Sequence, residues 1–143
     1  MKTAKWFLAV AAVLSIIVPL TLCSCSHSFP YQGSVTGNWS GQLTILARAI
    51  PVGGKLSITV DAKGAGSGTV SSSNGGAAPA TMTAQVDSNG NLTGTVSFTL
   101  AGTTFVSNWQ GKITASGNLL SIQGTWTSQH GSGTFSANGN TSK

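Results

Sequence analysis

The sequence predicts a small all-β protein, an antiparallel up-and-down meander of about eight strands that is barrel-like, with a β-sandwich as the alternative. Three observations support this prediction. Apolar residues alternate with Thr and Ser along most of the chain from residue 36 onward, which is typical of strands with one buried face. Gly, Asn and Ser interrupt the alternation at regular intervals, as hairpin turns require. Long runs of Ala, Leu, Glu and Lys that would favour helices are absent.

The strands can be placed one by one from this alternation. In the first, Trp39, Leu43 and Ile45 share one parity, and in the second Leu56, Ile58 and Val60 do so. The third is the weakest, because it consists mostly of Gly, Ser and Ala. The later strands alternate in the same way as the first two, and tight turns such as 87–91 and 116–118 separate them. We expect strands at residues 36–46, 54–61, 65–71, 80–87, 91–100, 103–115, 119–127 and 131–138.

The connections between the strands favour a barrel. Asp61 and Asp87 lie at strand ends beside Gly or Ser-Asn-Gly, where Asp commonly stabilises turns. Residues 48–54 and 69–80 are predicted as longer connections. Closing the sheet removes both of its edges, which suits a chain with few charges to protect an edge.

Length and charge limit the number of domains and the chemistry. The 143 residues correspond to one domain. Only 6% of the residues are charged, and Asp61 and Asp87 are the only acids. This composition argues against paired-carboxylate hydrolysis and against metal cages built from carboxylates. The net charge of +5 comes from basic residues scattered singly along the chain, so no nucleic-acid partner is expected.

The first 24 residues have the organisation of a secretory signal peptide. Lys2 and Lys5 precede an uncharged apolar stretch at 6–22, and small polar residues and cysteines follow. Pro19 interrupts the apolar stretch, and no basic stop-transfer run follows it. The alternative is an uncleaved membrane anchor.

Leu22-Cys23-Ser24-Cys25 resembles the lipobox of bacterial lipoproteins. The resemblance implies cleavage before Cys25, transfer of a diacylglyceryl group to its thiol, and acylation of the new N-terminus with a palmitate-type chain. Cys23 departs from the small or aliphatic residue usual at that place, and the competing register with Cys23 as the acylated residue fits worse. Ser26 lacks the Asp typical of inner-membrane retention, so the resemblance implies the outer membrane, with a secreted protein as the alternative. We therefore expect a signal peptide at 1–24, a lipidated N-terminus and polar tether at 25–35, and one β-domain at 36–143.

Catalytic, metal and cofactor sites are not expected from this sequence. A catalytic triad needs a base and an orienting acid, but His27 lies in the predicted tether and His130 in a predicted turn. A zinc site needs three or four Cys, His or carboxylate ligands. No spacing rule brings His130, Asp61 and Asp87 together.

Aromatic residues are the remaining candidates for a site. Trp39, Trp109, Trp126 and Phe98 fall on the predicted inward face, where a small barrel is either filled or holds one small ligand. Asn108 and Gln110 flank Trp109, an arrangement that would suit a sugar ring if Trp109 were exposed. Gly37-Asn38-Trp39 is similar to the G-x-W opening of lipocalin and avidin-type barrels, in which the Trp plugs one end of the barrel.

The expected function is that of a lipid-anchored cell-envelope protein with a non-catalytic barrel, binding a small apolar or carbohydrate ligand. A purely structural surface protein without a ligand is the first alternative, and a hydrolase is a remote one. The sequence does not indicate the oligomeric state.

Overall fold

The computed structural model describes residues 28–73, 78–100 and 103–142, and this part of the chain contains strands and no helix. Residues 1–24 and Cys25, where we expect the signal peptide and the lipidation site, lie outside the described residues. The strands are β1 (Gly33–Ile45), β2 (Arg48–Val60), β3 (Ala65–Ser72), β4 (Ala80–Val86), β5 (Asn91–Leu100), β6 (Thr103–Ser116), β7 (Leu119–Ser128) and β8 (Gly131–Thr141).

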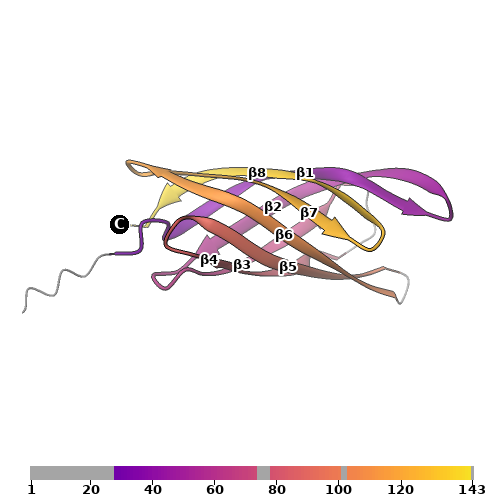
Figure 1. The fold of residues 1–143 in the computed structure, drawn as a ribbon, viewed down its shortest axis with the longest axis horizontal. Helices are drawn as coiled ribbons and strands as arrows, with labels where there is room; N and C mark the ends of the chain where they lie inside the picture. The colour runs from indigo at the N-terminus through magenta and orange to yellow at the C-terminus, as the bar shows by residue number, and fades with distance from the viewer. Residues whose placement is uncertain (1–27, 74–77, 101–102, 143) are drawn as a thin grey trace, which may run out of the picture.

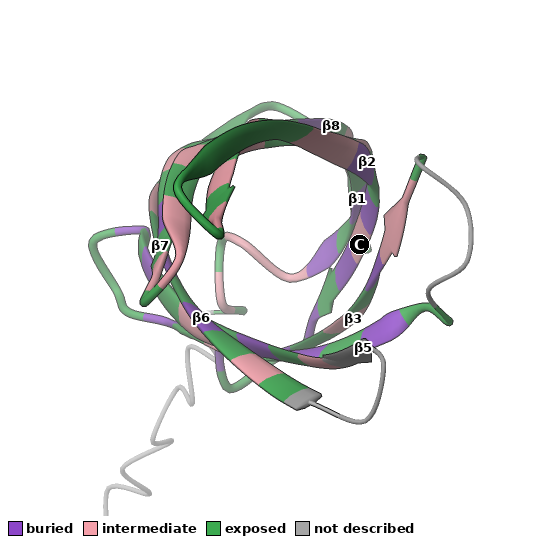
Figure 2. Cartoon of the chain, turned by 90° about the vertical axis from the view of Figure 1, so that its right-hand side faces the viewer, coloured by how far each residue is buried: buried purple, intermediate pink, exposed green. Residues whose placement is uncertain are grey.

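The eight strands form a closed antiparallel barrel in which every strand pairs with its neighbours in sequence (Figure 1). Closure comes from β1, which pairs with β2 on one side and with β8 on the other. A view along the barrel shows the strands as a ring around a central axis (Figure 2). The predicted eight-stranded meander and its barrel form are therefore confirmed, and the sandwich alternative is wrong.

The two ends of the barrel differ in their connections. One end, here called the closed end, holds the turns at 61–64, 87–90 and 117–118, together with both ends of the described chain. The other end, here called the mouth, holds the β1–β2 turn at 46–47 and the β7–β8 turn at 129–130. Figure 1 shows the N-terminal segment at the closed end and the β1–β2 hairpin projecting beyond the mouth.

Two turns of the same design shape the closed end. In each turn, one Asp carboxylate oxygen accepts hydrogen bonds from the backbone N–H groups two and four residues later, at 2.7 to 2.9 Å. Gly64 and Gly90 occupy the fourth position with φ of +81° and +80°, where a side chain would be strained. The prediction that Asp61 and Asp87 stabilise turns is therefore confirmed.

The N-terminal segment is more ordered than the predicted tether. β1 begins at Gly33 rather than at residue 36, and Val35 is only 1% exposed. Residues 33–35 form strand because both β2 and β8 supply backbone partners for them. Phe29 and Tyr31 meet edge to face with ring centroids 5.5 Å apart and pack against the core. Residues 33–35, which were predicted to belong to the tether, are therefore part of the barrel.

The β1–β2 hairpin is longer than predicted. Residues 48–54 were expected to be a connection, but β2 already begins at Arg48 and a two-residue turn, Leu46-Ala47, joins it to β1. The expectation was wrong because Pro51 suggested a loop. Pro51 pairs with Gln42 of β1 and precedes the β2–β3 ladder, which begins with Gly54 opposite Ser72, so its missing N–H removes no bond from that ladder.

The closed half of the barrel is packed with branched apolar side chains. Each alternates along its strand with a hydroxyl, amide or charged residue that faces outward. Burial on one face and exposure on the other hold the register of every strand, because a one-residue slip would exchange the two faces. Branched side chains at most 2% exposed in this half include Val35, Ile58, Val60, Val86, Leu92, Ile113, Leu120 and Ile122.

Candidate functional site

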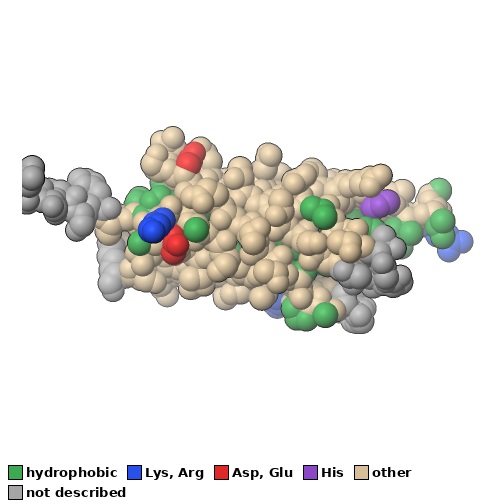
Figure 3. All heavy atoms as spheres, turned by 90° about the horizontal axis from the view of Figure 1, so that it is seen from below, with side chains coloured by type: hydrophobic (Ala, Val, Ile, Leu, Met, Phe, Trp, Pro, Cys, Tyr) green, Lys and Arg blue, Asp and Glu red, His purple; other side chains and the backbone are tan. Residues whose placement is uncertain are grey.

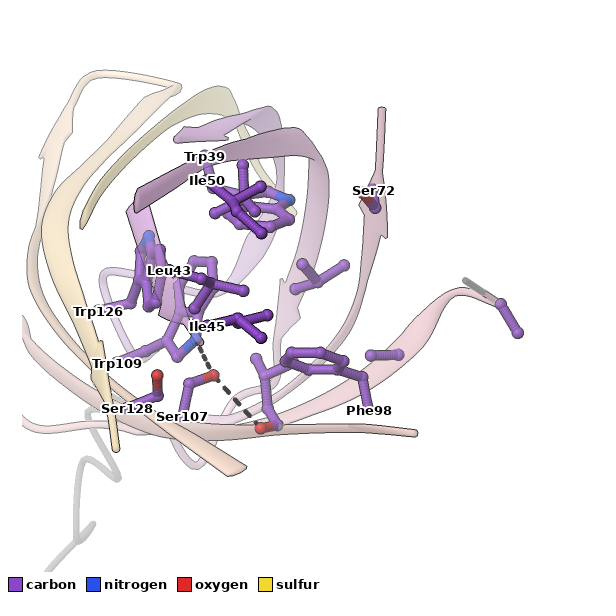
Figure 4. Close-up of a pocket in the computed structure, with 15 residues that line it drawn as sticks. Trp39, Leu43, Ile45, Ile50, Ser72, Phe98, Ser107, Trp109, Trp126 and Ser128 are labelled. Carbon is purple, nitrogen blue, oxygen red and sulfur yellow. Dashed lines mark hydrogen bonds between the residues drawn. The ribbon is translucent and has the colours of Figure 1, made fainter. Parts of the chain in front are cut away.

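The mouth half of the barrel contains an apolar cavity of about 240 Å³. Its walls come from every strand except β8, and Figure 4 shows the side chains that surround it. An apolar cavity of about 150 Å³ already holds benzene, so this one is large enough for an aromatic ring or a short hydrocarbon segment. The lining residues are Trp39, Leu43, Ile45, Ile50, Val52, Val70, Ser72, Ala78, Ala80, Val96, Phe98, Ser107, Trp109, Trp126 and Ser128.

Three indole rings form one side of the cavity. Trp39 meets Trp126 and Trp109 edge to face, with ring centroids 5.8 and 6.3 Å apart. Trp109 and Trp126 stack at 6.5 Å, and Phe135 supports Trp109 from 4.8 Å. Figure 4 shows the three indoles grouped together, with Phe98 on the opposite side of the space. Edge-to-face contacts of this kind are the arrangement that aromatic quadrupoles favour.

Inward-facing glycines make room for these rings. A Cβ built on Gly41 or Gly133 would collide with the ring of Trp126. A Cβ built on Gly124 would collide in the same way with Phe135, at 2.5 Å from Cζ. Large rings and glycines thus lie side by side in the wall, and the rings of Trp126 and Phe135 occupy the space that a side chain at these glycines would fill.

The polar edge of each indole is satisfied within the barrel. Trp39 Nε1 donates to the carbonyl oxygen of Ser71 at 3.0 Å, and Trp126 Nε1 donates to that of Ser40 at 3.0 Å. Trp109 Nε1 donates to the hydroxyl of Ser107 at 2.9 Å. The three rings consequently present apolar surface to the cavity and have no N–H left to offer a ligand.

Little other polarity reaches the cavity. None of its lining residues is charged. Ser107, which is 3% exposed, accepts from Trp109 and donates to the carbonyl oxygen of Val96 at 3.3 Å, as the dashed lines in Figure 4 show. The Ser128 hydroxyl donates to the carbonyl oxygen of Gly131 at 3.3 Å. A ligand in this space would be held mainly by contact with carbon.

All four residues predicted from the sequence line the same cavity. Trp39, Trp109, Trp126 and Phe98 come from four different strands and meet here because they share the inward parity. Trp109, however, is only 2% exposed, whereas Asn108 and Gln110 point outward. The amide-flanked exposed indole that would suit a sugar ring is therefore not formed.

Sequence reasoning missed the rest of the lining. Ile50 and Val52 lay in the predicted connection, although their parity continues that of Leu56 and could have revealed them. Val70, Ala80 and Val96 are small side chains from β3, β4 and β5. Nothing in the alternation indicates that these small residues leave a space.

The titratable residues lie apart. His130 is in the β7–β8 turn at the mouth, where its ring meets Phe105 edge to face at 5.4 Å. Asp61 and Asp87 are in the turns of the closed end, and Figure 3 shows the acidic and His side chains at opposite ends. Within the described ranges, no group of three or more His, Cys, Asp or Glu side chains could hold a metal ion.

Comparison with known proteins gives no family for this chain. No protein-family model matches the sequence, and no curated protein matches it. In the part of the chain that the structure describes, no helix is long and apolar enough to cross a membrane. The function is therefore argued from the cavity itself.

Proposed function

We propose that this chain is a lipid-anchored cell-envelope protein whose barrel binds a small, neutral, apolar ligand in the mouth cavity. The observation that carries the proposal is the uncharged cavity of about 240 Å³, walled by three indoles whose N–H groups are already bonded. Small-molecule sites are typically concave and mostly apolar, with a few polar groups. A solid structural barrel would have no use for this space.

The polarity of the lining favours a hydrocarbon or aromatic ligand over a carbohydrate. A sugar loses hydrogen bonds to water when it enters an apolar space, and each unpaired group costs roughly 1–3 kcal/mol. The hydroxyls of Ser107 and Ser128 are engaged with protein partners and could replace few of those bonds. A neutral ligand also avoids burying a charge beside uncharged walls.

Tryptophan emission tests ligand binding directly. We expect 1-octanol and naphthalene to shift the emission of the full chain with dissociation constants of the order of 1–100 µM, since few ligand atoms can be buried. Decanoate at neutral pH and N-acetylglucosamine should bind at least tenfold more weakly. Binding of the sugar alone would replace the apolar proposal, and no response to any probe would favour the structural alternative.

A matched pair of variants tests whether the ligand binds in the mouth cavity. Ala80 is 8% exposed and lines the cavity, whereas Thr81 beside it is exposed on the outer wall. Ala80→Phe should fill the cavity and lower the affinity for 1-octanol at least tenfold, and Thr81→Phe should leave it unchanged. Equal affinities in the two variants would locate binding elsewhere.

The anchor is tested by the intact mass of the protein extracted from its native membranes. A mass of residues 25–143 plus a diacylglyceryl group, with or without a third acyl chain, would support lipidation of Cys25. An unmodified shortened chain would indicate a secreted protein, and the full chain a retained anchor. The cavity proposal does not depend on which of these is found.

A further inference from the structure

The β1–β2 hairpin ends in an apolar tip that extends past the barrel wall. Leu46 is 93% exposed and Ile50 is 39% exposed, the highest and lowest of the four large exposed apolar side chains found in the described residues. Pairing with β3 begins at Gly54 of β2, and on the other side β1 is bonded as far as Thr44, whose N–H donates to the carbonyl oxygen of His130. Figure 1 shows this hairpin as the part of the fold furthest from the N-terminal segment.

The residues in the turn at the tip are unfavourable for the stability of the fold. Leu46 and Ala47 have φ of +50° and +60°, the left-handed region that two-residue hairpins fill with Asn-Gly. A non-glycine residue there costs roughly 1–2 kcal/mol. The chain therefore keeps an exposed Leu at a place where a polar pair would suit both the backbone and water better.

The apolar surface of the tip is continuous with the cavity. Ile45 and Ile50 belong to the hairpin, and both also line the cavity. Leu43 and Val52 extend the same face inward. Apolar surface thus runs from Leu46 in the hairpin turn to the indoles that line the cavity.

The charge at this end is positive. Among the described Asp, Lys and Arg residues, Arg48 is the one that adjoins the hairpin turn, as the first residue of β2. Figure 3 shows Lys or Arg side chains and no acidic side chain at this end. The acids, Asp61 and Asp87, lie in turns at the other end, and Lys63 and Lys112 lie with them. Lys55 is engaged part-way along the wall with the amide oxygen of Asn38 at 2.8 Å. An apolar tip with one cation and no acid beside it matches a layer that is apolar inside and anionic at its surface.

From these observations we infer that the β1–β2 hairpin docks on a lipid bilayer with anionic headgroups and places the mouth cavity against it, within reach of acyl chains. Interfacial segments bury their apolar face about 5–10 Å deep, which the projecting hairpin can reach. The use of the cavity for an acyl segment rests on the ligand binding proposed above. The docking itself rests on the hairpin.

Vesicle tethering tests the docking with the full chain. The chain carries a C-terminal His tag and is held on neutral phosphatidylcholine vesicles by a nickel-chelating lipid, so that its closed end faces the donor membrane. Protein-free acceptor vesicles contain phosphatidylcholine with or without phosphatidylglycerol, and energy transfer between labelled vesicles reports clustering. We expect clustering with the anionic acceptors.

The double variant L46N/A47G separates docking from folding, because it removes the apolar tip and supplies the residues that the turn prefers. It should lower the affinity for anionic acceptors at least tenfold, since a Leu no longer enters the bilayer. Arg48→Gln should lower it about fivefold and weaken the preference for anionic lipid. The matched control is Leu119→Asn, which removes a Leu that is 64% exposed at the closed end and should change nothing.

The outcomes are distinct. Clustering that L46N/A47G abolishes and Leu119→Asn preserves supports the inference. Clustering that is absent, that is the same in all variants, or that requires protein on both vesicle populations overturns it, the last outcome identifying a second copy of the chain as the partner. If 1-octanol still binds the cavity while docking fails, the proposed function stands and only the docking is wrong.

Discussion

The closed end and the mouth are built from the same eight strands and the same alternation, yet one is filled and the other is hollow. In the closed half, Ile58, Ile113 and Ile122 are fully buried. In the mouth half, the inward positions facing the indoles carry small residues such as Val70 and Ala80. The comparison shows that alternation decides which way a side chain points, whereas side-chain volume decides whether the barrel is solid.

The turns at the two ends also differ, in how well their residues suit the backbone conformation. At the closed end, Asp61 and Asp87 accept hydrogen bonds from the backbone N–H groups of their turns, and glycine occupies the position with positive φ in each turn. At the mouth, Leu46 and Ala47 occupy an unfavourable backbone region. The two Asp turns of the closed end thus favour stability, whereas the β1–β2 turn at the mouth carries residues that stability does not explain.

The largest expected effect comes from truncating one isoleucine in each half. Ile122→Ala should lower the free energy of unfolding by about 3 kcal/mol, because it opens a cavity in a packed region. Ile50→Ala should cost less than about 1 kcal/mol, because Ile50 is 39% exposed beside an existing space. Urea unfolding followed by circular dichroism measures both, and equal losses would contradict the contrast between the halves.

A somewhat smaller effect is expected where a glycine accommodates an indole. Gly133→Ala should destabilise the barrel by about 2 kcal/mol through overpacking against the Ser40 carbonyl oxygen and the Trp126 ring, and it should alter the near-ultraviolet circular dichroism of that ring. Gly53→Ala is the control, because its Cβ would meet one carbonyl oxygen at 2.9 Å and then nothing closer than 3.6 Å. A fully tolerated Gly133→Ala would show that the indoles are not fixed by these glycines.

Relaxing the mouth turn should stabilise the protein. L46N/A47G is expected to raise the free energy of unfolding by about 1 kcal/mol. The turn keeps its positive φ angles, and the variant places there Asn and Gly, the residues that this conformation favours. Gln129 and His130 form another two-residue turn at the mouth and are not among the described residues with positive φ. Q129N/H130G should therefore give no gain, and a similar gain from both variants would remove the argument from strain.

The smallest effect is a pH dependence at the closed end. Hydrogen bonds from the backbone and side chain of Asn91, with smaller contributions from the Asn89 N–H and the charge of Lys112, hold the pKa of Asp87 below its ordinary value. A carboxyl with a lowered folded pKa stabilises the fold above its unfolded pKa, and this contribution disappears as the pH falls through the folded value.

Asp87→Asn should accordingly be less stable than the wild type at neutral pH. The difference should shrink as the pH falls below about 4, near the pKa of an unperturbed Asp. Urea midpoints measured between pH 6 and pH 3 provide the check. A difference that is constant across this range would assign the effect to lost geometry instead of charge.

Much of the fold is predictable from local signals. Strands β3 to β8 begin where the alternation predicts them, because Gly, Asn and Asp mark the turns between them. β1 and β2 both begin earlier than predicted, β2 because Pro51 and the following glycines resemble a loop in the sequence. Barrel closure depends on the pairing of β1 with β8, which no local pattern encodes.

The candidate site was predictable only in part. Parity alone placed Trp39, Trp109, Trp126 and Phe98 on one inner surface. The cavity beside them depends on how the volumes of residues from seven strands add up around the ring. The indole N–H groups of Trp39 and Trp126 donate to backbone carbonyls that only the folded register brings close.

The pairing of β1 with β8 also has a consequence for the order of events in folding. The ring can close only when the last strand is available, because its seam joins residues from opposite ends of the chain. Contacts so distant in sequence are slow to form. A chain that becomes available progressively from its N-terminus would hold an open, incomplete sheet until β8 could pair with β1.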